Sequence, residues 1–154
     1  MLKILYSFAV AILTKLNFMR KKNSLSEFGS QRSKLLLENF RRSIVTQSQI
    51  SFKKAFHDAA NAPAPRFWVS EARATRVVAM MMKGENPLEG MRKEKREMYL
   101  EIFRRVNEMK DKRRGDSLGD LVFEVVNSEA PKSYLDWQWA QRLILKEKKA
   151  RIKR

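Results

Sequence analysis

Residues 61–70 of this chain read Asn-Ala-Pro-Ala-Pro-Arg-Phe-Trp-Val-Ser, and residues 127–136 repeat the pattern as Asn-Ser-Glu-Ala-Pro-Lys-Ser-Tyr-Leu-Asp. Both stretches follow the scheme Asn-x-x-Ala-Pro-basic-x-aromatic-aliphatic and end in a residue that favours a helix N-cap. Proline lacks a backbone N–H and pushes the residue before it out of helical geometry. Each stretch therefore predicts the end of one helix and the start of the next.

The similarity continues on both sides of this stretch. The segment that opens at Ser51 aligns without a gap with the segment that opens at Ser117, and Leu-Glu-Asn-Phe-Arg-Arg at 37–42 returns as Leu-Glu-Ile-Phe-Arg-Arg at 100–105. Repetition of this kind is typical of a structural module that has been copied. We predict an internal duplication, in which shared residues form the scaffold and residues that differ carry the function.

Apolar residues recur at helical spacing through both copies. The predicted helices cover residues 30–46, 51–61, 70–84, 93–111, 117–127 and 136 onward. The valines of residues 117–127 also suit a strand, but the alanine-rich counterpart at 51–61 favours a helix for both. Beyond Leu145 we expect a basic extension that frays in isolation.

The predicted fold is all-α, with two tandem three-helix modules in a helix-turn-helix-like internal duplication and a poorly packed or flexible N-terminal segment. The predicted divisions are an apolar and basic leader at 1–29, module 1 at 30–84, a linker at 85–92, and module 2 with a basic C-terminal tail at 93–154. Each module is small for an independent core. We therefore expect the two modules to pack on each other or to share a helix.

The first eighteen residues leave three interpretations open. A short apolar run, residues 4–13, resembles the core of a signal peptide, but Lys15 interrupts it, no small-x-small cleavage site follows, and it is too short to span a bilayer. The segment is an amphipathic membrane anchor, a poorly packed helix or the product of a mis-assigned start. We prefer the last interpretation because Met19 begins Met-Arg-Lys-Lys, an ordinary cytoplasmic opening. We therefore do not favour membrane contact through residues 1–18, and the sequence leaves open whether translation starts at Met1 or at Met19.

Charge is the strongest compositional signal. The 154 residues contain 33 Lys and Arg against 17 Asp and Glu, which gives a formal net charge of +16. This field attracts polyanions, nucleic acid first and an anionic membrane surface second. The chain has no cysteine, which excludes disulfides and thiolate metal sites and fits a cytoplasmic setting.

Enzyme chemistry finds little support in the sequence. The single histidine, His57, aligns with Phe123 of the second copy, so we interpret it as a residue of a helix face. Asp58 aligns with Glu124, yet each acid stands alone in its copy. No glycine-rich phosphate loop, nucleophile elbow or metal-ligand cluster appears, and a nuclease that uses carboxylates alone has no nominated ligands. We expect no enzyme, catalytic residue, cofactor or metal.

The function that we predict is binding of nucleic acid, with double-stranded DNA favoured, as a regulator or accessory factor. A short helix, a turn and a capped third helix is the plan of helix-turn-helix domains, where the third helix enters the major groove, although the turn here is longer than in the simplest of them. The second copy should carry most of the affinity. The candidate nucleic-acid-binding residues are Arg66, Arg73, Arg76, Lys132, Gln138, Gln141, Arg142, Lys146, Lys148, Lys149, Arg151, Lys153 and Arg154.

The alternative function is a helical protein–protein interaction or assembly protein without catalytic activity. Trp137 and Trp139 cannot both face one core, because residues two apart diverge on a helix, so one of them is available to a partner. Trp137 or Met80 would then contact that partner, although the run of methionines at 80–82 also suits a helix partly buried between modules. The repeated arginines at 41–42 and 104–105 can form ion pairs with nearby glutamates instead of binding phosphate.

Overall fold

The computed structural model describes residues 28–153 of the chain. Within this range six α-helices follow one another and no strand occurs, so the prediction of an all-α fold is confirmed. The helices are α3 Gly29–Thr46, α4 Phe52–Asn61, α5 Glu71–Met82, α6 Lys93–Lys112, α7 Leu118–Val126 and α8 Trp137–Ile152. Nearly all of the predicted leader, with the choice between Met1 and Met19 and the membrane contact, lies outside the described residues, as does Arg154.

Serine or aspartate caps four of these helices, and the repeated stretches predicted two of the four caps, Ser70 and Asp136. Ser51, Ser70 and Ser117 each accept a hydrogen bond from the backbone N–H three residues on. Asp136 accepts two, from the N–H groups of Gln138 and Trp139, at 2.8 and 3.0 Å. These bonds satisfy donors that the first turn of a helix otherwise leaves free. At the other end of the chain, α8 continues beyond Leu145 to Ile152, so the basic extension is part of this helix.

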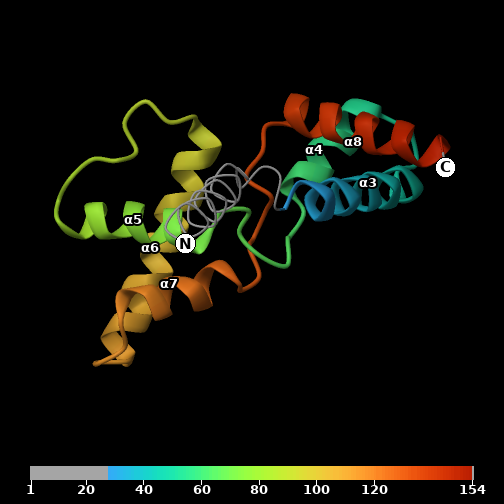
Figure 1. Ribbon diagram of the computed structural model, residues 1–154. Coiled ribbons are helices and arrows are strands. Elements are labelled where there is room, and N and C mark those ends of the chain that lie inside the picture. Colours follow the sequence, from blue (N-terminus) through green and yellow to red (C-terminus); the bar gives the residue numbers. More distant parts are fainter. Residues whose placement is uncertain (1–27, 154) are drawn as a thin grey trace, which may run out of the picture.

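The helices pack as two bundles that do not follow the two sequence copies. One bundle consists of α3, α4 and α8, and the other consists of α5, α6 and α7 (Figure 1). Within the described residues α4 makes no packing contact with α5, and α7 makes none with α8. The third helix of each copy therefore packs against the first two helices of the other copy, which differs from two modules that each fold within residues 30–84 and 93–154.

The repeated stretches at 61–70 and 127–136 form the crossover between the bundles. Ala64 and Ala130 exchange backbone hydrogen bonds of 2.9 and 2.8 Å in an antiparallel bridge. The N–H of Phe67 donates to the carbonyl of Val126, and the N–H of Ser133 donates to that of Ala60, at 3.0 and 3.1 Å. The members of each pair of bonds occupy corresponding positions of the two copies. The crossover is thus approximately two-fold symmetric. Its hydrogen bonds satisfy backbone carbonyl groups that the ends of α4 and α7 would otherwise leave unpaired.

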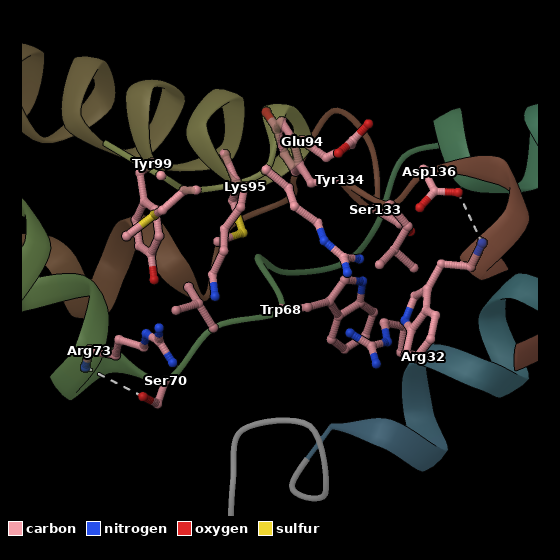
Figure 2. Close-up of a pocket in the computed structure, with 17 residues that line it drawn as sticks. Arg32, Trp68, Ser70, Arg73, Glu94, Lys95, Tyr99, Ser133, Tyr134 and Asp136 are labelled. Atoms are coloured by element: carbon pink, nitrogen blue, oxygen red, sulfur yellow. Dashed lines mark hydrogen bonds between the residues drawn. The ribbon is translucent and has the colours of Figure 1, made fainter. Parts of the chain in front are cut away.

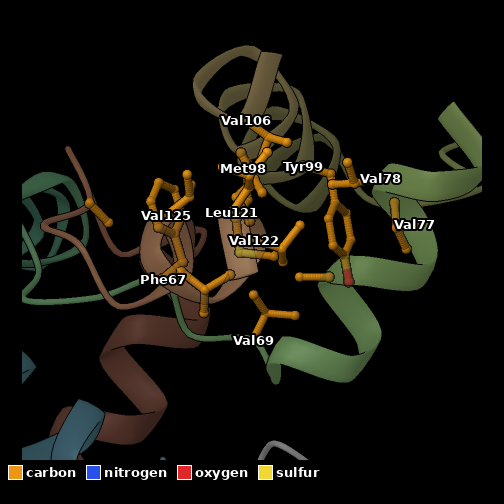
Figure 3. Packing of buried hydrophobic residues seen from close by; sticks show 14 of the residues in the cluster. Phe67, Val69, Val77, Val78, Met98, Tyr99, Val106, Leu121, Val122 and Val125 are labelled. Atoms are coloured by element: carbon orange, nitrogen blue, oxygen red, sulfur yellow. The ribbon is translucent and has the colours of Figure 1, made fainter. Parts of the chain in front are cut away.

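Each bundle has its own apolar core. In the α5–α6–α7 bundle, Tyr99 and Val106 of α6 meet Val78 of α5 and Val122 of α7, all fully buried (Figure 3). The second core contains Leu36, Leu37, Phe56, Ala59, Ala60, Ala140 and Ile144. The apolar spacing predicts an inward face of Ala74, Val77, Val78 and Met81 on α5 and of Ala140, Leu143 and Ile144 on α8. Met81 and Leu143 are partly buried and the other five are buried, but their neighbours come from the other copy. The segment predicted as a linker at 85–92 also contributes, since Leu88 is buried in the first core.

Candidate nucleic-acid interface and the cleft between the bundles

From Arg142 onward, α8 presents a dense group of exposed cations. Its members are Arg142, Lys146, Lys148 and Lys149, followed by Lys153 at the helix C-cap. None of the five forms an ion pair within residues 28–153, whereas Arg151 pairs with Glu147 at 3.2 Å. Gln138 is exposed and Gln141 half-buried on the first turns of the same helix. We call the five unpaired cations the α8 basic face.

The candidate residues of α5 belong to the other bundle. Arg73 and Arg76 are both exposed, and neither forms an ion pair within the described residues. Since α5 and α8 make no contact with each other, the two third helices are not buried against one another. The structure therefore separates the candidate residues into two groups, one on each bundle.

The basic residues of the repeated stretches make intramolecular contacts. The Arg66 guanidinium donates to the carbonyl oxygens of Phe67 and Val69 and lies 3.8 Å from the ring centroid of Phe28. Lys132 pairs with Glu97 of α6 at 2.6 Å. These contacts hold the crossover in place, and they engage donors that we expected to serve phosphate.

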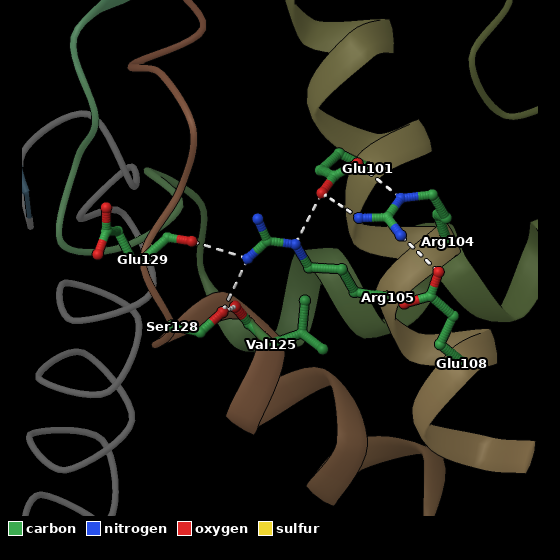
Figure 4. Close-up of polar contacts among 7 residues, drawn as sticks. All are labelled: Glu101, Arg104, Arg105, Glu108, Val125, Ser128 and Glu129. Carbon is green, nitrogen blue, oxygen red and sulfur yellow. Dashed lines mark hydrogen bonds and ion pairs between the residues drawn. The ribbon is translucent and has the colours of Figure 1, made fainter. Parts of the chain in front are cut away.

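The repeated arginines form the ion pairs that were the alternative to phosphate binding. Arg42 pairs with Glu38 at 3.4 Å in the first copy. In the second copy Glu101 accepts from both Arg104 and Arg105, and Arg105 reaches further to the Ser128 hydroxyl and the Glu129 carbonyl (Figure 4). The hydrogen bond from Arg104 is the main cause that lowers the pKa of Glu101 to about 2. This interpretation is confirmed for Arg42, Arg104 and Arg105.

The two tryptophans of α8 diverge as expected from their spacing. Trp137 packs on the imidazole of His57, with 5.2 Å between ring centroids. The Nζ atom of Lys53 lies 5.4 Å from the centroid of the Trp137 ring. Trp139 instead lines a cleft between the bundles, and Arg142 lies 5.8 Å from its ring centroid. His57 is therefore a residue of a packed helix face.

Among the methionines, Met81 and Met82 pack on the α5–α6–α7 core, and Met80 is half-buried.

The cleft has a volume of about 840 Å³ and takes walls from both bundles and from the crossover (Figure 2). Arg32 enters it from α3, Arg73 from α5, and Lys95 and Tyr99 from α6. Trp68 and Ser133 come from the two crossing stretches. Sequence patterns did not nominate Arg32, Lys95 or Tyr99, because Arg32 belongs to a different helix from Lys95 and Tyr99 and no local motif links the three.

Several polar groups around the cleft are buried without a partner. Within the described residues, five buried side-chain N or O atoms make no hydrogen bond, and four of them belong to residues that line this cleft. They are Nε of Arg32, Nε1 of Trp68, the hydroxyl of Tyr99 and the hydroxyl of Ser133. An unsatisfied buried group costs about 1–3 kcal/mol, so four around one cleft form a concentrated loss of stability.

The electrostatics of the cleft are dominated by cations. Burial lowers the pKa of Lys95, and the neighbouring charges of Arg73 and Arg92 lower it further. Burial also lowers the pKa of Arg32, which forms no ion pair within residues 28–153. Burial raises the pKa of Tyr99 against the opposing effect of Arg73, although the two side chains make no hydrogen bond of standard geometry. Two carboxylates, Glu94 and Asp136, line the cleft against four cations, so the negative charge there does not balance the positive charge.

Two further features of the described residues bear on function. No group of three or more His, Cys, Asp or Glu side chains in this range is arranged to hold a metal ion. None of the helices from α3 to α8 has the length and apolar character that crossing a membrane requires. Compared with known proteins, the chain matches no protein family, no curated protein and no solved structure.

Proposed function

We propose that this protein binds nucleic acid, with duplex DNA favoured, through the α8 basic face. The observation that carries the proposal is that this face holds five exposed cations without ion-pair partners in the described chain. Cations of this kind bind phosphate by releasing the counterions condensed on nucleic acid. The net charge of +16 adds a long-range attraction that speeds association. We place the protein in the cytoplasm, as a regulator or accessory factor without catalytic activity.

We also propose that the two copies descend from one duplicated unit whose third helices were exchanged. The reciprocal hydrogen bonds of the crossover support this origin, because they join corresponding positions of the copies. Each bundle then resembles a helix-turn-helix domain whose third helix is supplied by the other copy. In the α3–α4–α8 bundle, Gln138 and Arg142 occupy exposed positions near the start of that helix, where they can reach base edges in a major groove.

The proposal is tested by neutralising three lysines of the α8 basic face. The variant Lys146→Ala with Lys148→Ala and Lys149→Ala should bind a random DNA duplex more weakly. The slope of log affinity against log salt concentration should decrease by about 2–3, because each lost phosphate contact removes about 0.9 from it. Fluorescence anisotropy with a labelled duplex, repeated over a series of salt concentrations, measures both quantities.

A matched variant separates this face from overall charge. Lys83→Ala with Lys110→Ala and Lys112→Ala removes the same charge from exposed lysines of the α5–α6–α7 bundle. It should change the salt slope little. Equal losses in the two triple variants would show that only net charge matters, and the proposed face would be rejected. Labelled single-stranded DNA and duplex RNA, measured in parallel, test the preference for duplex DNA.

An assembly function is the second candidate, and exposed apolar side chains favour it. Val45 near the end of α3, Ile50 in the connection and Phe52 at the start of α4 are close along the chain, with 83, 63 and 63% of their surface exposed. An apolar group of this kind is a common feature of protein interfaces. Sedimentation of wild type and of Ile50→Ser with Phe52→Ser tests this candidate. Association that the double variant abolishes would support it, and a monomer at all concentrations would remove self-assembly.

A further inference from the structure

The cleft between the bundles combines buried polar groups that lack partners. The Arg32 side chain is only 7% exposed and Ser133 only 3%, yet Nε of the first and the hydroxyl of the second make no hydrogen bond within the described residues. The fully buried Tyr99 carries a third unpaired group. Buried polar atoms in folded proteins are almost always satisfied, so a cluster of exceptions around one cavity indicates a ligand that supplies the partners.

The charge of the cleft specifies an anion. Arg32, Arg73, Arg92 and Lys95 line it, against two carboxylates, Glu94 and Asp136. The Asp136 carboxylate is already engaged in capping α8. Figure 2 shows the Lys95 side chain extending from α6 between Tyr99 and Trp68, with Arg73 across the cleft. These cations repel one another, and a bound anion would offset that repulsion.

Helix termini add to the positive potential. The N-cap residues of three helices, Ser70 of α5, Arg92 of α6 and Asp136 of α8, all line the cleft. A helix N-terminus carries a partial positive charge and free N–H groups that favour phosphate. At α6 the capping residue, Arg92, is itself a cation and its side chain accepts no hydrogen bond from the first turn, so it adds positive charge to this terminus.

Aromatic side chains form the rest of the cleft. Trp68 and Tyr134 reach it from the crossing stretches and Trp139 from α8. Tyr134 has a φ of 52°, in the left-handed region, which a bulky side chain rarely adopts and which is often found at ligand sites. Indole and phenol faces stack well on heteroaromatic rings. The volume of about 840 Å³ is within the range of sites for small molecules.

We propose that this cleft binds a nucleotide, free or at the end of a strand. The phosphate would contact Arg73, Lys95 and Tyr99, while the base would stack on the aromatic walls and receive hydrogen bonds from Arg32 and Trp68. This site is separate from the α8 basic face, so the proposal stands independently of the function proposed above.

Calorimetric titration of the full chain with AMP and ATP tests the proposal. Saturable binding is expected, with weaker binding of adenosine and of inorganic phosphate, because each occupies only part of the cleft. Lys95→Ala should weaken nucleotide binding about tenfold or more, which is the usual effect of losing a hydrogen bond to a charged group. Lys110→Ala, an exposed lysine at the other end of the same helix, should leave binding unchanged.

The variant Arg32→Met separates a ligand site from a structural charge. A buried charge without a partner destabilises the free protein, so this variant should have an unchanged or higher Tm and weaker nucleotide binding. A lower Tm with nucleotide binding intact would show that Arg32 serves the fold alone, and it would overturn this part of the proposal.

Two results would overturn the site as a whole. The first is the absence of saturable binding for AMP, for ATP and for a short oligonucleotide with a 5′-phosphate. The second is binding that Lys95→Ala and Lys110→Ala reduce equally. Binding of the phosphorylated oligonucleotide alone would support the site and identify a strand end as its ligand. The triple lysine variant of α8 should bind AMP as wild type does, so failure of the proposed function and failure of this site are distinguishable.

Discussion

Glu101 shows how two residues with the same sequence context acquire different roles. It aligns with Glu38 in the repeated segment Leu-Glu-x-Phe-Arg-Arg. The Glu38 side chain is 68% exposed and its ion pair is long, whereas Glu101 is 21% exposed and accepts from two arginines. Through Arg105 the second pair also ties α6 to the crossover. The aligned sequences alone could not distinguish them, because burial depends on which segments lie nearby.

The prediction at this scale is that Glu101→Gln lowers the free energy of unfolding at pH 7 by about 1–2 kcal/mol. The folded pKa of Glu101 is lowered to about 2 from an ordinary value of 4.5, so its carboxylate stabilises the fold above pH 4.5. That contribution is lost as the pH falls from 4.5 toward 2. Urea unfolding followed by circular dichroism at several pH values measures it.

Glu38→Gln is the matched control for this prediction. Because its ion pair is exposed, we expect a change below about 0.5 kcal/mol. The difference between Glu101→Gln and wild type should also shrink at low pH. If the two variants lose the same stability at pH 7, the link from Glu101 through Arg105 to the crossover contributes nothing measurable.

At the scale of the helices, local signals placed the boundaries well. Serine or aspartate capped four helices where the sequence predicted, and the left-handed Gly84, with a φ of 79°, follows the end of α5. These signals depend on backbone groups only a few residues apart, so they are readable without tertiary structure. The sequence left the end of the helix that begins after residue 136 open, and the structure places it at Ile152, because a charged extension without an apolar face carries little local information.

Asp136 gives the prediction at this scale. Asp136→Ala should destabilise the protein by about 1 kcal/mol, since it leaves the N–H groups of Gln138 and Trp139 without their acceptor. Asp136→Asn keeps an oxygen acceptor and should retain most of the stability. Urea midpoints of the two variants, compared with wild type, measure the effect. Equal destabilisation by both substitutions would show that the negative charge matters more than the hydrogen bonds.

For the whole molecule, the packing of α5 on α6 and α7 and of α8 on α3 and α4 makes the two halves of the described chain interdependent. Each bundle takes helices from both copies, and the crossing stretches join the bundles through four backbone hydrogen bonds. Neither copy contains a complete core. The structure should therefore unfold in one cooperative transition, although its helices form two separate bundles.

Ile144→Ala tests this cooperativity. Ile144 is fully buried between α8 and its neighbours, and its truncation should cost about 2–5 kcal/mol. Amide hydrogen exchange should report an equal loss of stability in α4 of the same bundle and in α7 of the other bundle. Retention of wild-type protection in α7 would show that the bundles unfold independently, and the crossover would then be a passive connection.

The sequence by itself determined the helical class, the helix boundaries and the inward faces of the third helices, because periodicity, caps and prolines act over short distances. It also showed that the stretch Asn-x-x-Ala-Pro-basic-x-aromatic-aliphatic occurs twice, at 61–69 and 127–135. Only the tertiary structure decided which helices pack together, since two similar copies present similar apolar faces and a third helix can pack on either. The same choice brought Arg32, Lys95 and Tyr99 around one cleft, so the site that we propose there exists only once the chain has folded.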